Sequence, residues 1–180
     1  MKETGGTMDL DVLQDLVAGL FTDPKATMYK GRNPENQVPT LFLAAAGILL
    51  GALFSFMSTF SPISLIVSLI AGALIFVIWV TSIFIGGKVT GGKGSFMEIA
   101  QLCGLIQLPL GAFSGLMTLF HLGIVSFIVS LVVGYYLMLI GHSFSGFKDV
   151  IFAYIISIIL YIGGIMFVSS LTMALLKMFI

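Results

Sequence analysis

Residues 41–60 read LFLAAAGILLGALFSFMSTF, and residues 63–85 read ISLIVSLIAGALIFVIWVTSIFI. Neither stretch contains a charged side chain, and each is long enough, as a helix, to cross roughly 30 Å of bilayer hydrocarbon. Within lipid every backbone N–H and C=O must find a partner inside the protein, which leaves helices or a closed barrel. Because neither stretch alternates apolar and polar residues as a barrel strand does, both are predicted to be transmembrane helices.

Three further apolar stretches are long enough to span a membrane, at about residues 98–119, 122–141 and 150–173. Hydrophobic residues make up 58% of the 180-residue chain and charged residues only 9%, against roughly 25% charged in a typical soluble domain. A soluble domain of this size cannot bury so much apolar surface. The sequence therefore predicts an all-α polytopic membrane protein with five transmembrane helices, and it excludes a soluble enzyme. The net charge of zero gives no reason to expect a nucleic-acid partner.

The chain divides into a polar head, residues 1–38, and a membrane bundle, residues 39–180. Apolar residues recur at helical spacing over about residues 9–22, which predicts an amphipathic helix in the head. This helix has three candidate roles: a flap over the bundle, a docking helix for a partner, or an anchor on the lipid surface. Its acidic polar face argues against the last, because surface helices usually carry Lys or Arg there. The apolar positions are Leu10, Leu13, Leu16, Val17, Leu20 and Phe21.

Lysine and arginine residues indicate the orientation of a membrane protein, because cytoplasmic loops carry an excess of them. With the N-terminus in the cytoplasm, seven of the eight basic residues lie on the inner side and only Lys177 lies outside. The predicted topology is therefore N-in and C-out, with a cytoplasmic head. The seven inner residues are Lys2, Lys25, Lys30, Arg32, Lys88, Lys93 and Lys148.

The connection after the second span is rich in glycine and reads GGKVTGGKG at residues 86–94. We expect a loop there, since glycine destabilises a helix interior by about 1 kcal/mol. Part of it matches the G-x-x-x-x-G-K pattern of phosphate-binding loops, but Gly94 stands where Ser or Thr should follow, and no strand precedes it. Nucleotide binding is therefore not expected. The next residues, Ser95-Phe96-Met97-Glu98, fit the capping box that begins a helix.

The third span is the most polar of the five, because Glu98, Gln101, Cys103 and Gln107 fall in its first half. Pro109 follows near the middle and predicts a kink, since proline removes one backbone hydrogen bond from a helix. Gln107 is placed to bond the freed backbone. Two interpretations remain, a fixed bend held by interhelical hydrogen bonds and a cavity or moving element. The candidate functional patch comprises Gly91, Gly92, Lys93, Gly94, Ser95, Glu98, Gln101, Gln107 and Pro109.

Glycines at four-residue spacing occur in two of the spans. Gly47-x-x-x-Gly51 lies in the first span and Gly111-x-x-x-Gly115 in the third. Small residues at this spacing let helices approach closely, within one chain or between chains. We predict helix packing at these four glycines, and homo-oligomerisation stays open as a second use of such stripes.

Residue sets that carry catalysis are not found in the sequence. It contains no H-E-x-x-H zinc motif and no G-x-S-x-G nucleophile motif. The two histidines, His121 and His142, fall at opposite membrane faces in the predicted topology, so they cannot share a metal ion. We therefore expect no enzyme activity, no catalytic residue, no metal site and no cofactor.

Three stretches, in order, resemble the Yip family, small five-span membrane proteins named for their interaction with Ypt/Rab GTPases. The stretches are Phe21-Thr22-Asp23-Pro24-Lys25, Gly91 to Glu98 (GGKGSFME), and Cys103 to Leu110 (CGLIQLPL). The resemblance covers about residues 8–175. Leu105 stands where the family usually has Tyr, and the long N-terminal region of eukaryotic members is missing, so a short prokaryotic-type member is expected.

The resemblance implies a non-enzymatic adaptor or organiser in membrane organisation or vesicle traffic, acting through its cytoplasmic face. It implies membrane lipids, a second copy of the chain, and a cytoplasmic or membrane protein as partners, with a small GTPase among them only through the family. The expected location is a prokaryotic cell membrane, or the Golgi or ER membrane in a eukaryote. The alternative is a small channel, carrier or lipid-moving protein that uses the kinked polar third span.

Overall fold

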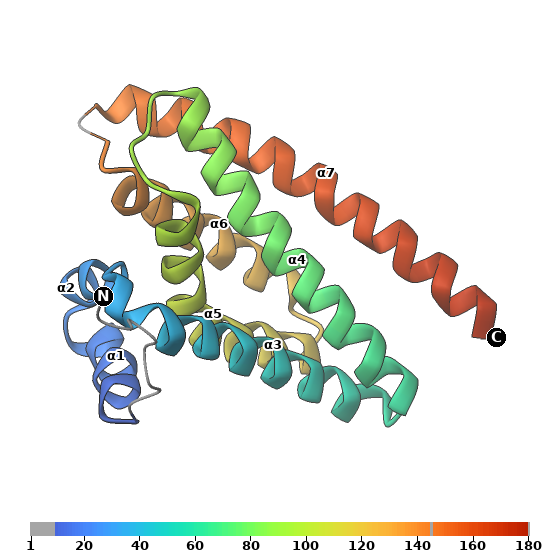
Figure 1. Ribbon diagram of the computed structural model, residues 1–180. Helices are drawn as coiled ribbons and strands as arrows, with labels where there is room; N and C mark the ends of the chain where they lie inside the picture. Colours follow the sequence, from blue (N-terminus) through green and yellow to red (C-terminus); the bar gives the residue numbers. More distant parts are fainter. Residues whose placement is uncertain (1–9, 145, 180) are drawn as a thin grey trace, which may run out of the picture.

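The computed structural model describes residues 10–144 and 146–179, and within them the chain is helical with no strands. Two helices form the head, and five longer helices follow a short 3-10 turn (Figure 1). The elements are α1 (Leu10–Thr22), α2 (Pro24–Gly31), η1 (Pro34–Asn36), α3 (Gln37–Thr59), α4 (Pro62–Val89), α5 (Phe96–Leu119), α6 (Gly123–His142) and α7 (Phe147–Phe179).

Five of these helices are long and apolar enough to cross a membrane, which confirms the predicted all-helical class and number of spans. The connections between the spans contain residues whose backbone conformation ends a helix. Pro62 follows a left-handed Phe60 and occupies the first turn of α4, where its missing N–H costs nothing. His121 and Ser143 also have positive φ, at the two ends of α6.

The glycine-rich connection is shorter than expected. We predicted a loop from residue 86, but α4 continues to Val89, and the loop comprises only residues 90–95. Gly86 packs directly on Ala153 and Ser157 of α7, and Gly87 packs on the ring of His142, so no side chain fits at either position. Close packing offsets the helix penalty of the two glycines, and the sequence expectation was wrong here.

The tightest helix pair is α3 with α5. A Cβ atom on Gly47 would meet the Gln107 carbonyl and lie 2.8 Å from the Leu108 amide nitrogen, and one on Gly111 would meet the Gly47 carbonyl. Gly115 lies against the ring of Phe54, whereas Gly51 has room, its nearest neighbour being the Gly111 carbonyl oxygen at 3.9 Å. Within the described chain, the glycines of the two stripes thus face each other across α3 and α5.

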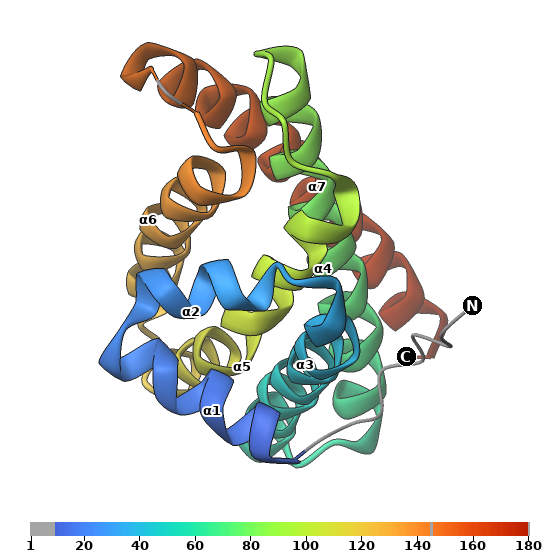
Figure 2. The same ribbon diagram turned by 60° about the vertical axis from the view of Figure 1, so that its left-hand side comes forward.

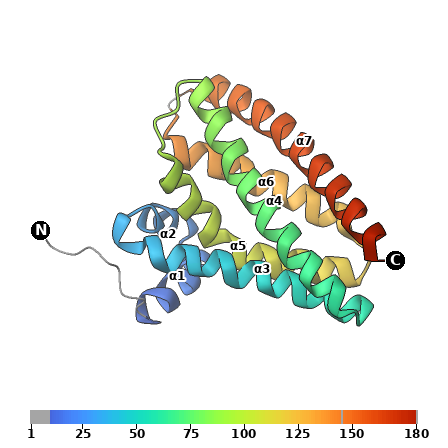
Figure 3. The same cartoon turned by 45° about the vertical axis from the view of Figure 1, so that its right-hand side comes forward.

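The long helix α5 is bent. In Figures 1 and 3 its first half runs away from the α4 end, and its second half turns to lie along α3. Pro109 lies inside the helix, and its ring and missing N–H break the hydrogen-bond ladder there. The predicted kink is therefore present. Because α5 bends, its first half meets both the head and the start of α3, where Gly104 lies against Thr40, and its second half follows the rest of α3.

The other long helices complete the bundle around this pair. α7 lies beside α4 along most of its length (Figures 1 and 3). The head helices α1 and α2 lie across the α5 side of the bundle, between α6 and α3 (Figure 2). Leu16 of α1 and Met28 of α2 are buried in the same apolar cluster as Leu102, Leu105 and Leu137, so head and bundle share a core.

Replacing Gly111 by alanine is expected to destabilise the protein by about 1–3 kcal/mol, because the new methyl group meets the α3 backbone. Gly163→Ala is the matched control, since a Cβ there meets nothing within 4 Å and alanine improves helix propensity by up to about 1 kcal/mol. Thermal unfolding in detergent measures both. Equal unfolding temperatures for the two variants would contradict the close contact.

The orientation is testable with single cysteines, because the one native thiol, Cys103, is buried. Thr59→Cys and Lys93→Cys place exposed thiols at opposite ends of the bundle. With the N-terminus inside, a membrane-impermeant maleimide added to intact cells should label position 59 and spare position 93 until the membrane is opened. Labelling in the reverse order would establish the inverted topology.

Candidate functional site at the junction of head and bundle

Arg32 follows α2 and joins three parts of the chain. Its Nη2 donates to Glu98 Oε1 at 2.8 Å, and its Nη1 donates to the Ile140 carbonyl oxygen at 2.9 Å and to Ser143 Oγ at 3.3 Å. The side chains of Arg32 and Glu98 are 17% and 33% exposed. One guanidinium group thus connects the end of α2, the start of α5 and the end of α6. The N–H donors of a guanidinium lie in one plane and point in fixed directions, so one arginine can bond several acceptors at once.

Glu98 uses both carboxylate oxygens. While Oε1 accepts from Arg32, Oε2 accepts from the Ser95 amide at 2.7 Å, and Ser95 Oγ accepts from the Glu98 amide at 3.2 Å. The predicted capping box is therefore present at the start of α5. The carboxylate also lies at the positive end of the helix dipole. Glu98 serves helix capping and the ion pair at the same time.

Gln101 makes a second connection between α5 and the head. Its Nε2 donates to the Asn33 carbonyl oxygen at 3.0 Å, and its side chain is 1% exposed. Glu98 and Gln101 are three residues apart, which places them on one face of the helix. We call Arg32, Asn33, Ser95, Glu98 and Gln101 the polar junction.

His142 is fully buried beside the polar junction. Its Nε2 lies 3.1 Å from the Ile83 carbonyl oxygen, while Nδ1 has no hydrogen-bond partner in the described chain. Three glycines enclose the ring, because a Cβ atom at Gly87, Gly92 or Gly94 would meet it. The Lys93 amide donates to the His142 carbonyl oxygen at 3.2 Å. The 90–95 loop is therefore packed on the end of α6.

The other residues of the predicted patch lie elsewhere. Gln107 lines a separate cavity of about 340 Å³, together with Ser55 and Ser68, and Glu98 is not among its lining residues. The Gln107 side chain makes no hydrogen bond within the described part of the chain, so the predicted bond to the backbone freed by Pro109 is not formed. Pro109 lines a third region, a groove against the head. The predicted patch thus divides into three places.

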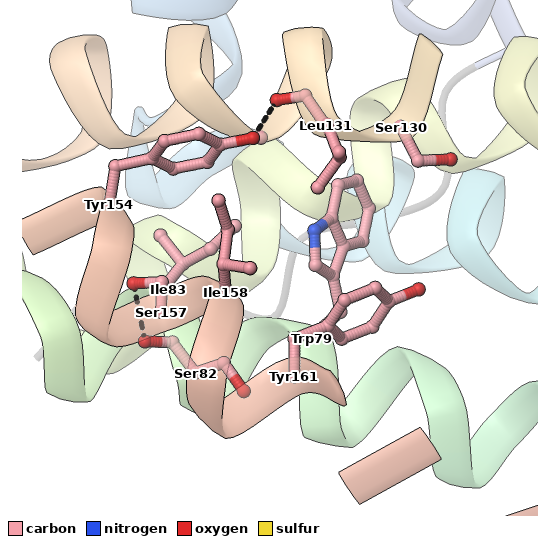
Figure 4. Close-up of a pocket in the computed structure, with 10 residues that line it drawn as sticks. Trp79, Ser82, Ile83, Ser130, Leu131, Tyr154, Ser157, Ile158 and Tyr161 are labelled. Atoms are coloured by element: carbon pink, nitrogen blue, oxygen red, sulfur yellow. Dashed lines mark hydrogen bonds between the residues drawn. The ribbon is translucent and has the colours of Figure 1, made fainter. Parts of the chain in front are cut away.

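Two hydroxyl groups of α7 bond to α6 and α4 where the three helices meet (Figure 4). Tyr154 donates to the Leu131 carbonyl oxygen, and Ser157 Oγ donates to the Ser82 carbonyl oxygen at 2.8 Å. The cavity between the three helices has a volume of only about 20 Å³, which is room for roughly one water molecule. These hydroxyls hold helices together. In the described residues no group of three His, Cys, Asp or Glu could hold a metal ion.

Sequence reasoning missed two features of this region. Arg32 was counted only for topology, and His142 was interpreted as an interfacial polar residue. The ion pair joins positions 66 residues apart, a separation that no local pattern reveals. The close spacing of Gly87, Gly92 and Gly94 was a usable signal for a near neighbour, although it does not name the imidazole.

A family model described as the Yip1 domain matches residues 18–171. The match includes the end of α1, all of α2 and the polar junction, and it extends through the described spans to residue 171 of α7. No curated protein and no solved structure matches the chain.

Removing the guanidinium by Arg32→Gln is expected to loosen the head, because Glu98 and the Ile140 carbonyl lose their partner. Hydrogen–deuterium exchange of residues 24–36 should accelerate. Lys30→Gln is the control, since Lys30 pairs with Asp15 at 3.2 Å on the open surface, where such pairs contribute about 0–1 kcal/mol. Unchanged exchange in Arg32→Gln would show that the junction does not hold the head.

Proposed function

Because this chain belongs to the Yip1 family, we propose that it is a non-enzymatic membrane adaptor or organiser that acts through its cytoplasmic face in membrane organisation or vesicle traffic. The family match covers most of the chain, including the head from residue 18. One stretch that resembles the family in sequence, residues 91–98, supplies most of the 90–95 loop and two members of the polar junction, Ser95 and Glu98.

The observation that carries this proposal is a folded head that exposes large apolar side chains outside the spans. The first span begins at Pro34, yet Leu10 is 73% exposed and Tyr29 is 51% exposed on the helices before it. Apolar side chains that gather into a patch outside the hydrocarbon mark interaction sites, and these exposed residues are the candidates for such a patch on the head. Arg32 and Gln101 fix this surface to α5, so it is presented in a defined orientation.

The proposed partner is a cytoplasmic or membrane protein, and a small GTPase is proposed only through the family. The partner is expected on the cytoplasmic side, because seven of the eight basic residues lie on the same side as the head in the N-in topology. The outer connections are short, so the head and the 90–95 loop are the segments available to a soluble protein.

The channel or carrier alternative is less well supported. Transport through the third span would use a polar path from Gln107 to the bundle mouth at Glu98. The cavity at Gln107 does not reach Glu98, whose carboxylate is bound to Arg32 and Ser95. His142, an ionisable group beside the polar junction, is fully buried and enclosed by Gly87, Gly92 and Gly94, so it lines no open path.

Site-specific photo-crosslinking in native membranes tests the adaptor role. A photoreactive residue at Tyr29 should give a discrete protein adduct, whereas the same residue at the exposed Val132 of α6, inside a span, should give mainly lipid adducts. Arg32→Gln should reduce the Tyr29 adduct several-fold, and Lys30→Gln should not. No Tyr29 adduct above the Val132 level, or one insensitive to Arg32→Gln, would contradict the proposal.

A further inference from the structure

A groove of about 720 Å³ lies between the head and the helices α5 and α6. Its walls are almost entirely apolar and come from three elements: Phe21 and Met28 from the head, Ile106 and Phe113 from α5, and Val133 and Leu139 from α6. We call it the head groove. Figure 2 shows the head helices α1 and α2 crossing in front of α5, with α6 beside them.

The head groove lies where the membrane spans meet the head, at the edge of the bilayer. Two of its walls belong to membrane spans, whereas the third belongs to the head that precedes the first span. Open apolar surface next to water is unfavourable by about 25 cal/mol per Å². The volume falls in the range of small-molecule sites, which are mostly apolar with a few polar groups at fixed places. An acyl chain from the adjoining lipid leaflet is the apolar ligand at hand.

Two opposite charges lie at the head end of the groove. Asp23 and Lys25 both line it, two residues apart at the start of α2. Asp23 Oδ1 accepts from the Ala26 amide at 3.1 Å as the helix cap, and a carboxylate has about four acceptor sites, so this bond leaves others. One cation and one anion side by side complement a zwitterionic headgroup. They do not favour a purely anionic one.

We propose that the head groove holds one acyl chain of a zwitterionic phospholipid whose headgroup carries a primary ammonium. The phosphate lies at Lys25, and the ammonium donates to Asp23. This ligand makes the seating of the head dependent on the lipid around it, which the adaptor proposal does not require.

Native mass spectrometry of the purified full chain tests the acyl site. The protein is loaded with an equal mixture of phosphatidylethanolamine, phosphatidylglycerol and phosphatidylcholine, and it should retain phosphatidylethanolamine preferentially. Val133→Phe fills the groove and should lower retention roughly tenfold, equivalent to about two fewer buried methylenes. Val132→Phe is the matched control, because Val132 directly precedes Val133 in the sequence, is 54% exposed and does not line the groove.

The headgroup contacts have separate variants. Asp23→Asn keeps a good helix cap but removes the charge, so retention should persist while the preference over phosphatidylglycerol disappears. Lys25→Gln should lower retention of all three phospholipids. Lys148→Gln is the control, because this exposed lysine does not line the groove, and it should leave retention unchanged.

A second readout uses the unmodified chain, so that a folding defect in Val133→Phe does not decide the result. A phosphatidylethanolamine with a diazirine in its acyl chain should crosslink to peptides that contain Phe113 or Val133. Crosslinks confined to the outer face of α7, equal retention by Val133→Phe and Val132→Phe, or no headgroup preference in the native protein would each overturn the proposal. A second copy of the chain or another protein crosslinked within the groove would also overturn it.

Discussion

The guanidinium of Arg32 is the interaction on which the arrangement of the head depends. It reaches Glu98 on α5 and the Ile140 carbonyl on α6 from the end of α2, so it fixes the head to two spans at once. Charge-assisted hydrogen bonds of this kind are stronger than neutral ones, and partial burial reduces their screening by salt. The apolar groove beneath the head and the exposed head surface both follow from this attachment. Gln101 and the shared apolar core at Leu16 and Met28 support the same attachment.

The bundle supports this attachment through contacts that only glycine permits. Gly47 and Gly111 bring α3 onto the second half of α5, and the Pro109 bend then directs the first half of α5 toward the head. Gly87, Gly92 and Gly94 enclose His142, which holds the 90–95 loop against the end of α6. That loop leads into the capping box of Glu98. Close packing inside the bundle therefore positions the carboxylate that meets Arg32.

The spans were predictable because hydropathy and length act locally, and so were the capping box and the kink at Pro109, which depend on residues within one helical turn. The end of α4 could not be predicted locally, because Gly86 and Gly87 stay helical through their packing against α7 and His142, despite their low helix propensity. The expected Gln107 hydrogen bond is also not formed, and the Gln107 side chain lines the cavity with Ser55 and Ser68 instead. Arg32 and His142 were missed because their partners are far away in the sequence. Which predicted polar residues cluster is decided by tertiary structure, and only Ser95, Glu98 and Gln101 share the junction.

The most direct measurement is a double-mutant cycle with Arg32→Gln, Glu98→Gln and the double variant, with hydrogen-exchange protection of residues 24–36 as the readout of head stability. Residues in contact usually show coupling energies of about 0.5–3 kcal/mol, and independent sites add within about 0.5 kcal/mol. If the ion pair seats the head, the coupling energy should be about 1 kcal/mol or more, and the double variant should be little worse than either single one. Additive effects, or full protection in all three variants, would contradict the account.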